Sequence, residues 1–166
     1  MNKTEEKSQE VHFRILNAVT KLEVSKGHLG WKISDVAKEA EVTRSLVYYY
    51  LGKDKQVILS EAVKFMLEKV FNLFEDEPVR VQYRIKIALQ EIKHMPYLLV
   101  LFILNRKKDN FVGEIIRAGE ERLFSLLQKI YPTLKPNDIL KIYLLELGAA
   151  MYGDLSEAQV EEFFPE

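Results

Sequence analysis

Three consecutive tyrosines, Tyr48, Tyr49 and Tyr50, stand just before a basic, glycine-marked turn in the stretch EVTRSLVYYYLGKDK, residues 41–55. A phenolic hydroxyl can donate a hydrogen bond to a phosphate oxygen, and the ring that carries it can also pack in a core. Consecutive residues of a helix point about 100° apart, so three in a row cannot share one face. At least one of these rings must therefore lie partly in solvent.

Catalytic and metal-binding patterns are absent from the sequence. His12, His28 and His94 are far apart and lack the spacing of metal ligands. There is no glycine-rich phosphate loop and no nucleophile motif. The neighbouring acids Glu120–Glu121 and Glu161–Glu162 are explained by solvated helix faces. We therefore expect no enzyme activity, no cofactor and no metal.

The composition is that of a soluble globular protein. Of 166 residues, 48% are apolar and 30% are charged, which suits one domain or two small ones that share a core. The absence of cysteine excludes disulfides and fits a reducing cytoplasm. The N-terminal stretch MNKTEEKSQE lacks the apolar core of a signal peptide, and the longest apolar run, Tyr97–Leu104, is shorter than the about 20 residues that span a bilayer. We expect a cytoplasmic protein without a membrane segment.

Helical periodicity extends over nearly the whole sequence. Residues 79–87 alternate apolar and polar as in a strand, but a helical apolar face covers a longer window there, and nothing nearby supplies a partner strand. We therefore expect a helix in that segment too. The expected helices are one that Gly27 ends, two short ones at Ser34–Ala40 and Arg44–Leu51, one from about Asp54 to Asp76, one after Pro78, one after Pro96, and then about Phe111–Tyr131, Pro136–Tyr152 and a last turn near Glu157–Phe164.

The first helix, the two short helices and the tight turn between them form the layout of a helix-turn-helix unit. In such a unit the second short helix lies in the major groove of DNA, and the other helices brace it against the backbone. Short helices joined by turns are common in helical proteins, so the layout needs support from the residues themselves.

From Ile15 to Leu59 the chain resembles the DNA-binding domain of TetR-family transcriptional regulators. The resemblance implies an all-α fold, with an N-terminal three-helix helix-turn-helix DNA-binding head at residues 1–56. It further implies a helical body at residues 57–166 that binds an effector and forms the dimer. The matching segments are ILNAV (15–19), Gly27, Gly30, ISDVAKEAEV (33–42), Thr43 and VYYYLGKDKQVIL (47–59).

The resemblance also assigns roles in DNA binding. Thr43 lies where a hydroxyl caps the recognition helix, and Arg44 and Ser45 lie where family members touch base edges. The tyrosines match positions near phosphates, although core packing explains such rings equally well for Tyr50. Nearby lysines are assigned to phosphate contacts rather than to solubility alone. The predicted DNA-binding residues are Lys32, Thr43, Arg44, Ser45, Tyr48, Tyr49, Tyr50, Lys53 and Lys55.

Four residues depart from the family pattern. Glu41 replaces the glycine usual in the turn, Glu23 stands where an aromatic normally packs, and Trp31 stands where Thr or Ser is usual. Asp54 takes the place of a lysine that commonly holds phosphate. The charge asymmetry is also mild, because residues 1–57 hold 10 Lys/Arg against 8 Asp/Glu, a net +2, and residues 58–166 hold 14 against 17, a net −3. These features keep an alternative open: a TetR-fold ligand- or protein-binding module that has lost specific DNA binding.

For the body, the resemblance implies a pocket for a small apolar effector, and it implies a homodimer. Dimerisation is assigned to the helices at about 111–131 and 136–152, because both are long and apolar-faced and residues 148–150, Gly-Ala-Ala, permit close approach. The predicted protein is then a homodimeric repressor that binds double-stranded DNA at a palindromic operator and is released by the effector. Aromatic residues expected around the pocket, each of which could equally be plain core, are Phe65, Phe74, Tyr83, Tyr97, Phe102 and Phe111.

Overall fold

The structure is a computed structural model, and it describes residues 3–73 and 81–163. Within these residues every regular element is an α-helix, which confirms the predicted all-α class. The helices are α1 (Lys3–Lys26), α2 (Ile33–Glu39), α3 (Arg44–Leu51), α4 (Lys55–Val70), α5 (Val81–His94), α6 (Pro96–Asn105), α7 (Phe111–Ile130), α8 (Pro136–Tyr152) and α9 (Glu157–Phe163).

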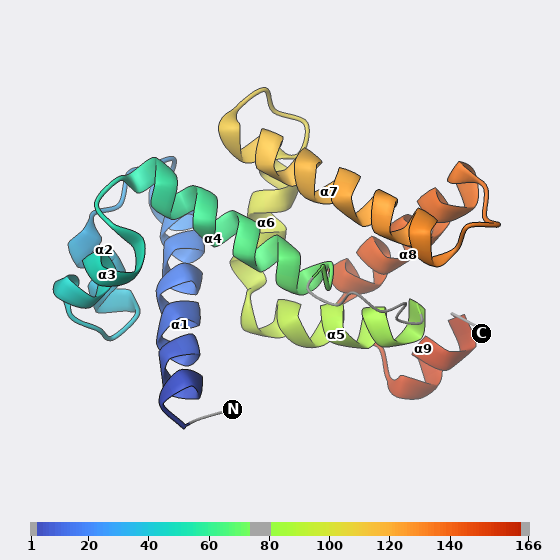
Figure 1. Cartoon of the computed structure of the whole chain (residues 1–166), viewed down its shortest axis with the longest axis horizontal. Coiled ribbons are helices and arrows are strands. Elements are labelled where there is room, and N and C mark those ends of the chain that lie inside the picture. The colour runs from blue at the N-terminus through green and yellow to red at the C-terminus, as the bar shows by residue number, and fades with distance from the viewer. Residues whose placement is uncertain (1–2, 74–80, 164–166) are drawn as a thin grey trace.

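The first three helices lie together at one end of the molecule, and α4 extends from them into the remaining helices (Figure 1). The caps that start these helices are local. Asp35 accepts a hydrogen bond from Lys32 N at 2.8 Å at the start of α2, and Thr43 Oγ1 accepts one from Leu46 N at 3.3 Å at the start of α3. The expected cap at Thr43 is therefore present, and α2 and α3 form the predicted helix-turn-helix.

The turn between α2 and α3 contains a residue in the left-handed region. Glu41 has φ 55°, a conformation that glycine adopts without cost and that strains a residue with a side chain. The guanidinium of Arg14 on α1 donates to Ala40 O at 2.5 and 3.1 Å and to Glu41 O at 3.1 Å. Arg14 therefore holds the turn in the shape that the missing glycine would otherwise favour.

Helix α4 ends earlier than the sequence predicted. Its last helical residue is Val70, and Asn72 takes the left-handed φ of 48°, which asparagine tolerates better than most residues. The predicted end near Asp76, like Pro78, lies outside the described residues. The boundary expected at residues 56 and 57 lies in the first turn of α4, so this one helix belongs to both parts of the chain.

The C-terminal helices pack on α4 and on each other. Helix α7 packs along α4, α8 packs along α5 and α7, and α9 covers α5 (Figure 1). Residues 81–87, the described part of the segment with alternating residues, are helical, as expected, in α5. One apolar core joins α1, α2, α3, α4, α6, α7 and α8, and a smaller cluster joins α5, α8 and α9.

Among residues 3–73 and 81–163, no single helix combines the length and apolar character that a membrane span requires. Helices α5 and α6 reach that combination only as a pair, across a bend of 100°.

Candidate nucleic-acid interface and effector site

The recognition helix candidate α3 presents four of the predicted residues to solvent. Arg44 and Ser45 in its first turn are exposed, Tyr48 is 40% exposed and Tyr49 is 81% exposed. On the opposite face Val47 and Leu51 are buried. Because the inner face anchors the helix, α3 presents these outer side chains at the surface.

Tyr50 turns away from this outer face. Its hydroxyl lies 2.7 Å from Ser8 Oγ, and its ring stacks on His12 with the centroids 5.4 Å apart. Both partners belong to α1, and His12 also meets the ring of Phe65 on α4 at 5.6 Å. Burial lowers the pKa of the His12 imidazole, and the carboxylate of Glu61 partly opposes that effect. Tyr50 therefore braces the recognition helix against the first helix.

Asp54 lies in the turn after α3 and is the N-cap residue of α4. Its carboxylate caps α4, accepting from Gln56 N at 2.8 Å and from Val57 N at 3.3 Å. A negative charge at a helix N-terminus is also favoured by the helix dipole. Asp54 thus occupies the amides that an N-terminal phosphate contact would use.

The three predicted lysines differ in their availability. Lys55 Nζ donates to Leu29 O at 2.7 Å and lies 5.5 Å from the centre of the Trp31 ring, so it is engaged within the protein. Lys53 is exposed, with its Nζ 5.9 Å from the centre of the Tyr48 ring. Lys32 is exposed at the N-cap of α2. Lys32 and Lys53 are therefore the better placed of the three to meet an anion outside the protein.

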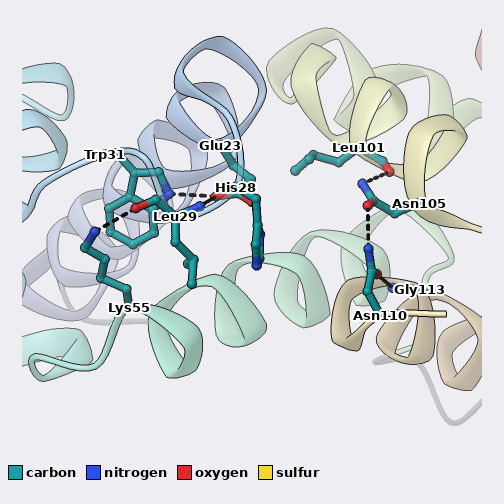
Figure 2. Close-up of polar contacts among 9 residues, drawn as sticks. All are labelled: Glu23, His28, Leu29, Trp31, Lys55, Leu101, Asn105, Asn110 and Gly113. Carbon is teal, nitrogen blue, oxygen red and sulfur yellow. Dashed lines mark hydrogen bonds and ion pairs between the residues drawn. The ribbon is translucent and has the colours of Figure 1, made fainter. Parts of the chain in front are cut away.

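A buried carboxylate organises the loop between α1 and α2. Glu23, 6% exposed, accepts at Oε2 from Trp31 Nε1 at 2.7 Å and from Leu29 N at 3.0 Å, while His28 Nδ1 lies 2.7 Å from its Oε1 (Figure 2). Trp31 is fully buried beneath Lys55. Glu23 and Trp31, two of the residues that depart from the family pattern, are therefore hydrogen-bond partners, and the indole N–H satisfies the buried carboxylate.

The same loop touches the body of the protein. The His28 ring lies 5.3 Å from the ring of Phe111, the first residue of α7. The start of α7 is fixed by Asn110, whose side chain accepts from Gly113 N at 2.8 Å and donates to Asn105 Oδ1 at 3.2 Å (Figure 2). A Cβ atom at Gly113 would lie 2.3 Å from Lys108 O, so only glycine allows this close approach. The loop after α1 therefore contacts a part of the body that is held by these hydrogen bonds.

The aromatic residues predicted around an effector pocket do not come together. A cavity of about 40 Å³ lies between α4, α5, α6 and α8, and of the predicted set only Phe102 lines it. Phe65 packs on His12, Phe111 on His28, and the Tyr97 ring lies under Lys21. Tyr83 is half exposed on α5, and Phe74 lies outside the described residues.

Buried polar groups border this cavity. Glu146 of α8 lines it and pairs with Arg84 Nε of α5 at 3.1 Å, and burial raises the pKa of Glu146 against the opposing effect of Arg84. Tyr143 also lines it and donates to Glu120, which is buried, unlike the solvated position expected from the sequence, and pairs with Arg106 Nε at 2.6 Å. Burial and the bond to Glu120 raise the pKa of Tyr143 well above its usual range. These groups lock α5, α6, α7 and α8 together.

Exposed apolar side chains collect on α8 and α9 rather than on α7. The outward residues of α7 are polar or small, among them Glu121, Ser125 and Gln128. A groove of about 450 Å³ lies between α8 and α9. Apolar residues that are 42% to 69% exposed on these two helices are Leu140, Leu144, Leu145, Met151, Tyr152 and Phe163.

Comparisons with known proteins give a match of structure only. No protein-family model matches the sequence, and no curated protein matches it either. The crystal structure of a HlyIIR mutant protein with a GSSGSSG linker is similar at a TM-score of 0.62 and 21% identity, over 96% of this chain and 94% of that one. A Rhodococcus sp. protein named as a TetR-family transcriptional regulator is similar at a TM-score of 0.53 and 15% identity, over 93% of this chain and 95% of that one. The chain therefore has the fold of TetR-family transcriptional regulators.

Proposed function

We propose that this chain is a DNA-binding transcriptional regulator that acts as a repressor. The observation that carries the proposal is the arrangement of α3, whose buried inner face supports an outer face of exposed Arg44, Ser45, Tyr48 and Tyr49. A helix held in this way can enter the major groove with its first turn toward the base edges.

The proposed roles follow from what each side chain is free to do. Arg44 reads a guanine edge through two donors, and Tyr48 and Tyr49 donate to phosphates. Lys32 and Lys53 neutralise phosphates beside the helix. Tyr50 and Lys55, with partners at 2.7 Å inside the protein, position the helix and the turn rather than contact DNA directly.

The proposed assembly is a homodimer through α8 and α9. This differs from the expectation that α7 pairs with α8. The apolar residues of α7, among them Leu123 and Leu127, are buried inside the subunit, and the outer face of α7 is polar. A two-fold axis at α8 and α9 would carry two heads, which a palindromic operator accommodates at about 34 Å in successive major grooves. Light scattering at micromolar concentration should give the dimer mass, and Leu144→Glu should give the monomer. A monomer mass for the unmodified chain would contradict this assembly.

Release by a small apolar effector is the proposed regulation. An effector that favours a different spacing of the two heads weakens operator binding by population shift. The interior cavity of about 40 Å³ is smaller than ligand sites, which measure about 300–1,000 Å³. Binding inside it therefore requires the helices around it to separate.

Selection of bound sequences from a random DNA library tests the DNA-binding role and delivers the operator. Arg44→Ala should then cost about 1–3 kcal/mol on the selected operator and relax preference at one position. Tyr48→Phe should weaken all duplexes about equally, because phosphates carry no sequence information. Two results together would favour the alternative, a TetR-fold binding module that has lost specific DNA binding. The first is a selection that enriches no sequence, and the second is a fluorescence anisotropy of random duplex that does not change with salt concentration when the protein is added.

A further inference from the structure

A second site for a small molecule lies on the outside of the protein, between α4 and α7. We call it the α4–α7 groove. Its volume is about 380 Å³, within the range of about 300–1,000 Å³ for ligand sites and well above the interior cavity of about 40 Å³. Its apolar lining residues are Leu67 from α4, Leu73 after it, and Ile115, Ala118 and Gly119 from α7.

The floor of the α4–α7 groove is thin. A Cβ atom at Gly119 would lie 3.4 Å from Leu67 Cδ1, so α7 rests directly on α4 at this point. Leu67 lines both the groove and the interior cavity. A ligand in the groove would therefore contact a side chain that also lines the interior cavity.

The rim of the groove carries balanced charge. Arg122 Nη1 donates to Glu68 Oε1 at 2.8 Å across its mouth, and Arg122 Nη2 lies 3.3 Å from Leu73 O. Lys64 and Glu114 add one charge of each sign, and neither forms an ion pair with another described residue. With two cations and two carboxylates around an apolar floor, a charged ligand has no net attraction, whereas an uncharged apolar one gains burial.

Both walls of the groove reach the same loop of the head. At the start of α4, Lys55 Nζ donates to Leu29 O at 2.7 Å. At the start of α7, the Phe111 ring lies 5.3 Å from the His28 ring. Figure 2 shows Lys55 on one side of the loop after α1 and the first turn of α7 on the other. The start of α4 and the start of α7 therefore both contact the loop that leads into α2.

We propose that the α4–α7 groove binds a small, uncharged apolar molecule, and that this occupancy weakens DNA binding by moving α4 and α7 apart under the loop after α1. The binding site stands on the groove itself, whereas its effect on DNA rests on the proposed function. The effector of the proposed function would then enter from the outer surface rather than fill the interior cavity.

The test uses the full chain and N-phenyl-1-naphthylamine, an uncharged dye with a naphthyl and a phenyl group whose fluorescence rises when it leaves water. Because the chain has no cysteine, Ala118→Cys introduces a single thiol on the exposed part of the floor. Alkylation of this thiol with N-benzylmaleimide then fills the groove. Because the reaction is carried out on the folded protein, the added group does not affect folding. The matched control is Ser125→Cys, alkylated in the same way on the exposed face of α7 away from the groove. Ala150→Val narrows the interior cavity instead.

Saturable binding of one dye per chain is expected. The filled Ala118→Cys protein should bind it about tenfold more weakly or worse, and the Ser125→Cys and Ala150→Val proteins should bind it as the unmodified chain does. Saturating dye should also raise the Kd for duplex DNA at least about fivefold. Absence of saturable binding, or binding that the filled groove does not change, would overturn the site. If the ligand-free chain binds no duplex, the proposed function is wrong. The dye titration still tests whether the groove binds an apolar molecule, because it does not involve DNA.

Discussion

The buried carboxylate of Glu23 offers a sharp test of how this protein holds its DNA-binding end together. Replacing it in Glu23→Leu leaves two donors, Trp31 Nε1 and Leu29 N, without the acceptor that they now reach at 2.7 and 3.0 Å. A buried donor that loses its partner costs about 1–3 kcal/mol, so the two together should lower the free energy of unfolding by about 2–6 kcal/mol. The loop that also accepts from Lys55 should loosen with them.

A double-mutant cycle isolates the indole contact. In a Trp31→Phe background the indole donor is already gone, so Glu23→Leu should cost about 1–3 kcal/mol less than it does in the unmodified chain. Urea denaturation followed by circular dichroism measures all four proteins, and Glu10→Leu on the exposed face of α1 serves as the control that should change little. If Glu23→Leu proves too unstable, Glu23→Gln replaces it with the same sign expected.

The reasoning would be refuted by a coupling free energy near zero, since that would mean that Glu23 and Trp31 stabilise the protein independently. It would also be refuted if Glu23→Leu were stabilising. Such a result would show that burying an apolar side chain at this position outweighs both hydrogen bonds.

Three smaller changes test other parts of the site. Asp54→Ala should lower the unfolding free energy by about 1 kcal/mol because the α4 cap is lost, whereas Asp54→Asn should keep the cap and tighten binding to any duplex, as anisotropy would reveal. Glu41→Gly should raise the unfolding free energy in urea by up to about 1 kcal/mol by relieving its φ of 55°, and a loss would contradict the strain. His12 has a lowered pKa, so the unfolded chain takes up its proton first, and stability should fall as the pH drops below 6.5. In His12→Gln that part of the pH dependence should disappear, and an unchanged profile would remove His12 as its source.

Much of the fold could be predicted from local sequence signals, namely helix caps, prolines and apolar periodicity. Thr43 and Asp54 precede the helices that they cap, and Pro96 and Pro136 stand in the first turn of theirs. The alternating residues from position 81 onward are helical, because the apolar face of α5 continues over a longer window than a strand would need. Periodicity and caps are properties of neighbouring residues, which is why they can be read before the chain is folded.

The parts that sequence reasoning missed depend on contacts between distant elements. Glu23 and Trp31 looked like two separate departures, because nothing in the sequence says that a loop returns the indole to the carboxylate. The apolar residues of α7 were visible, but only the fold shows that Leu123 and Leu127 are already covered by other helices. Large aromatic residues such as Phe65, which were expected to line an effector pocket, pack against other side chains instead.

The position of Trp31 gives the protein a built-in optical reporter. It is the single tryptophan of the chain, it is fully buried, and its ring lies 5.5 Å from the ammonium group of Lys55. Indole emission responds to the polarity and charge around the ring, so selective excitation of tryptophan reports on one junction only. Any event that moves α4 away from the loop after α1 will therefore shift the wavelength of tryptophan fluorescence emission from the unlabelled protein.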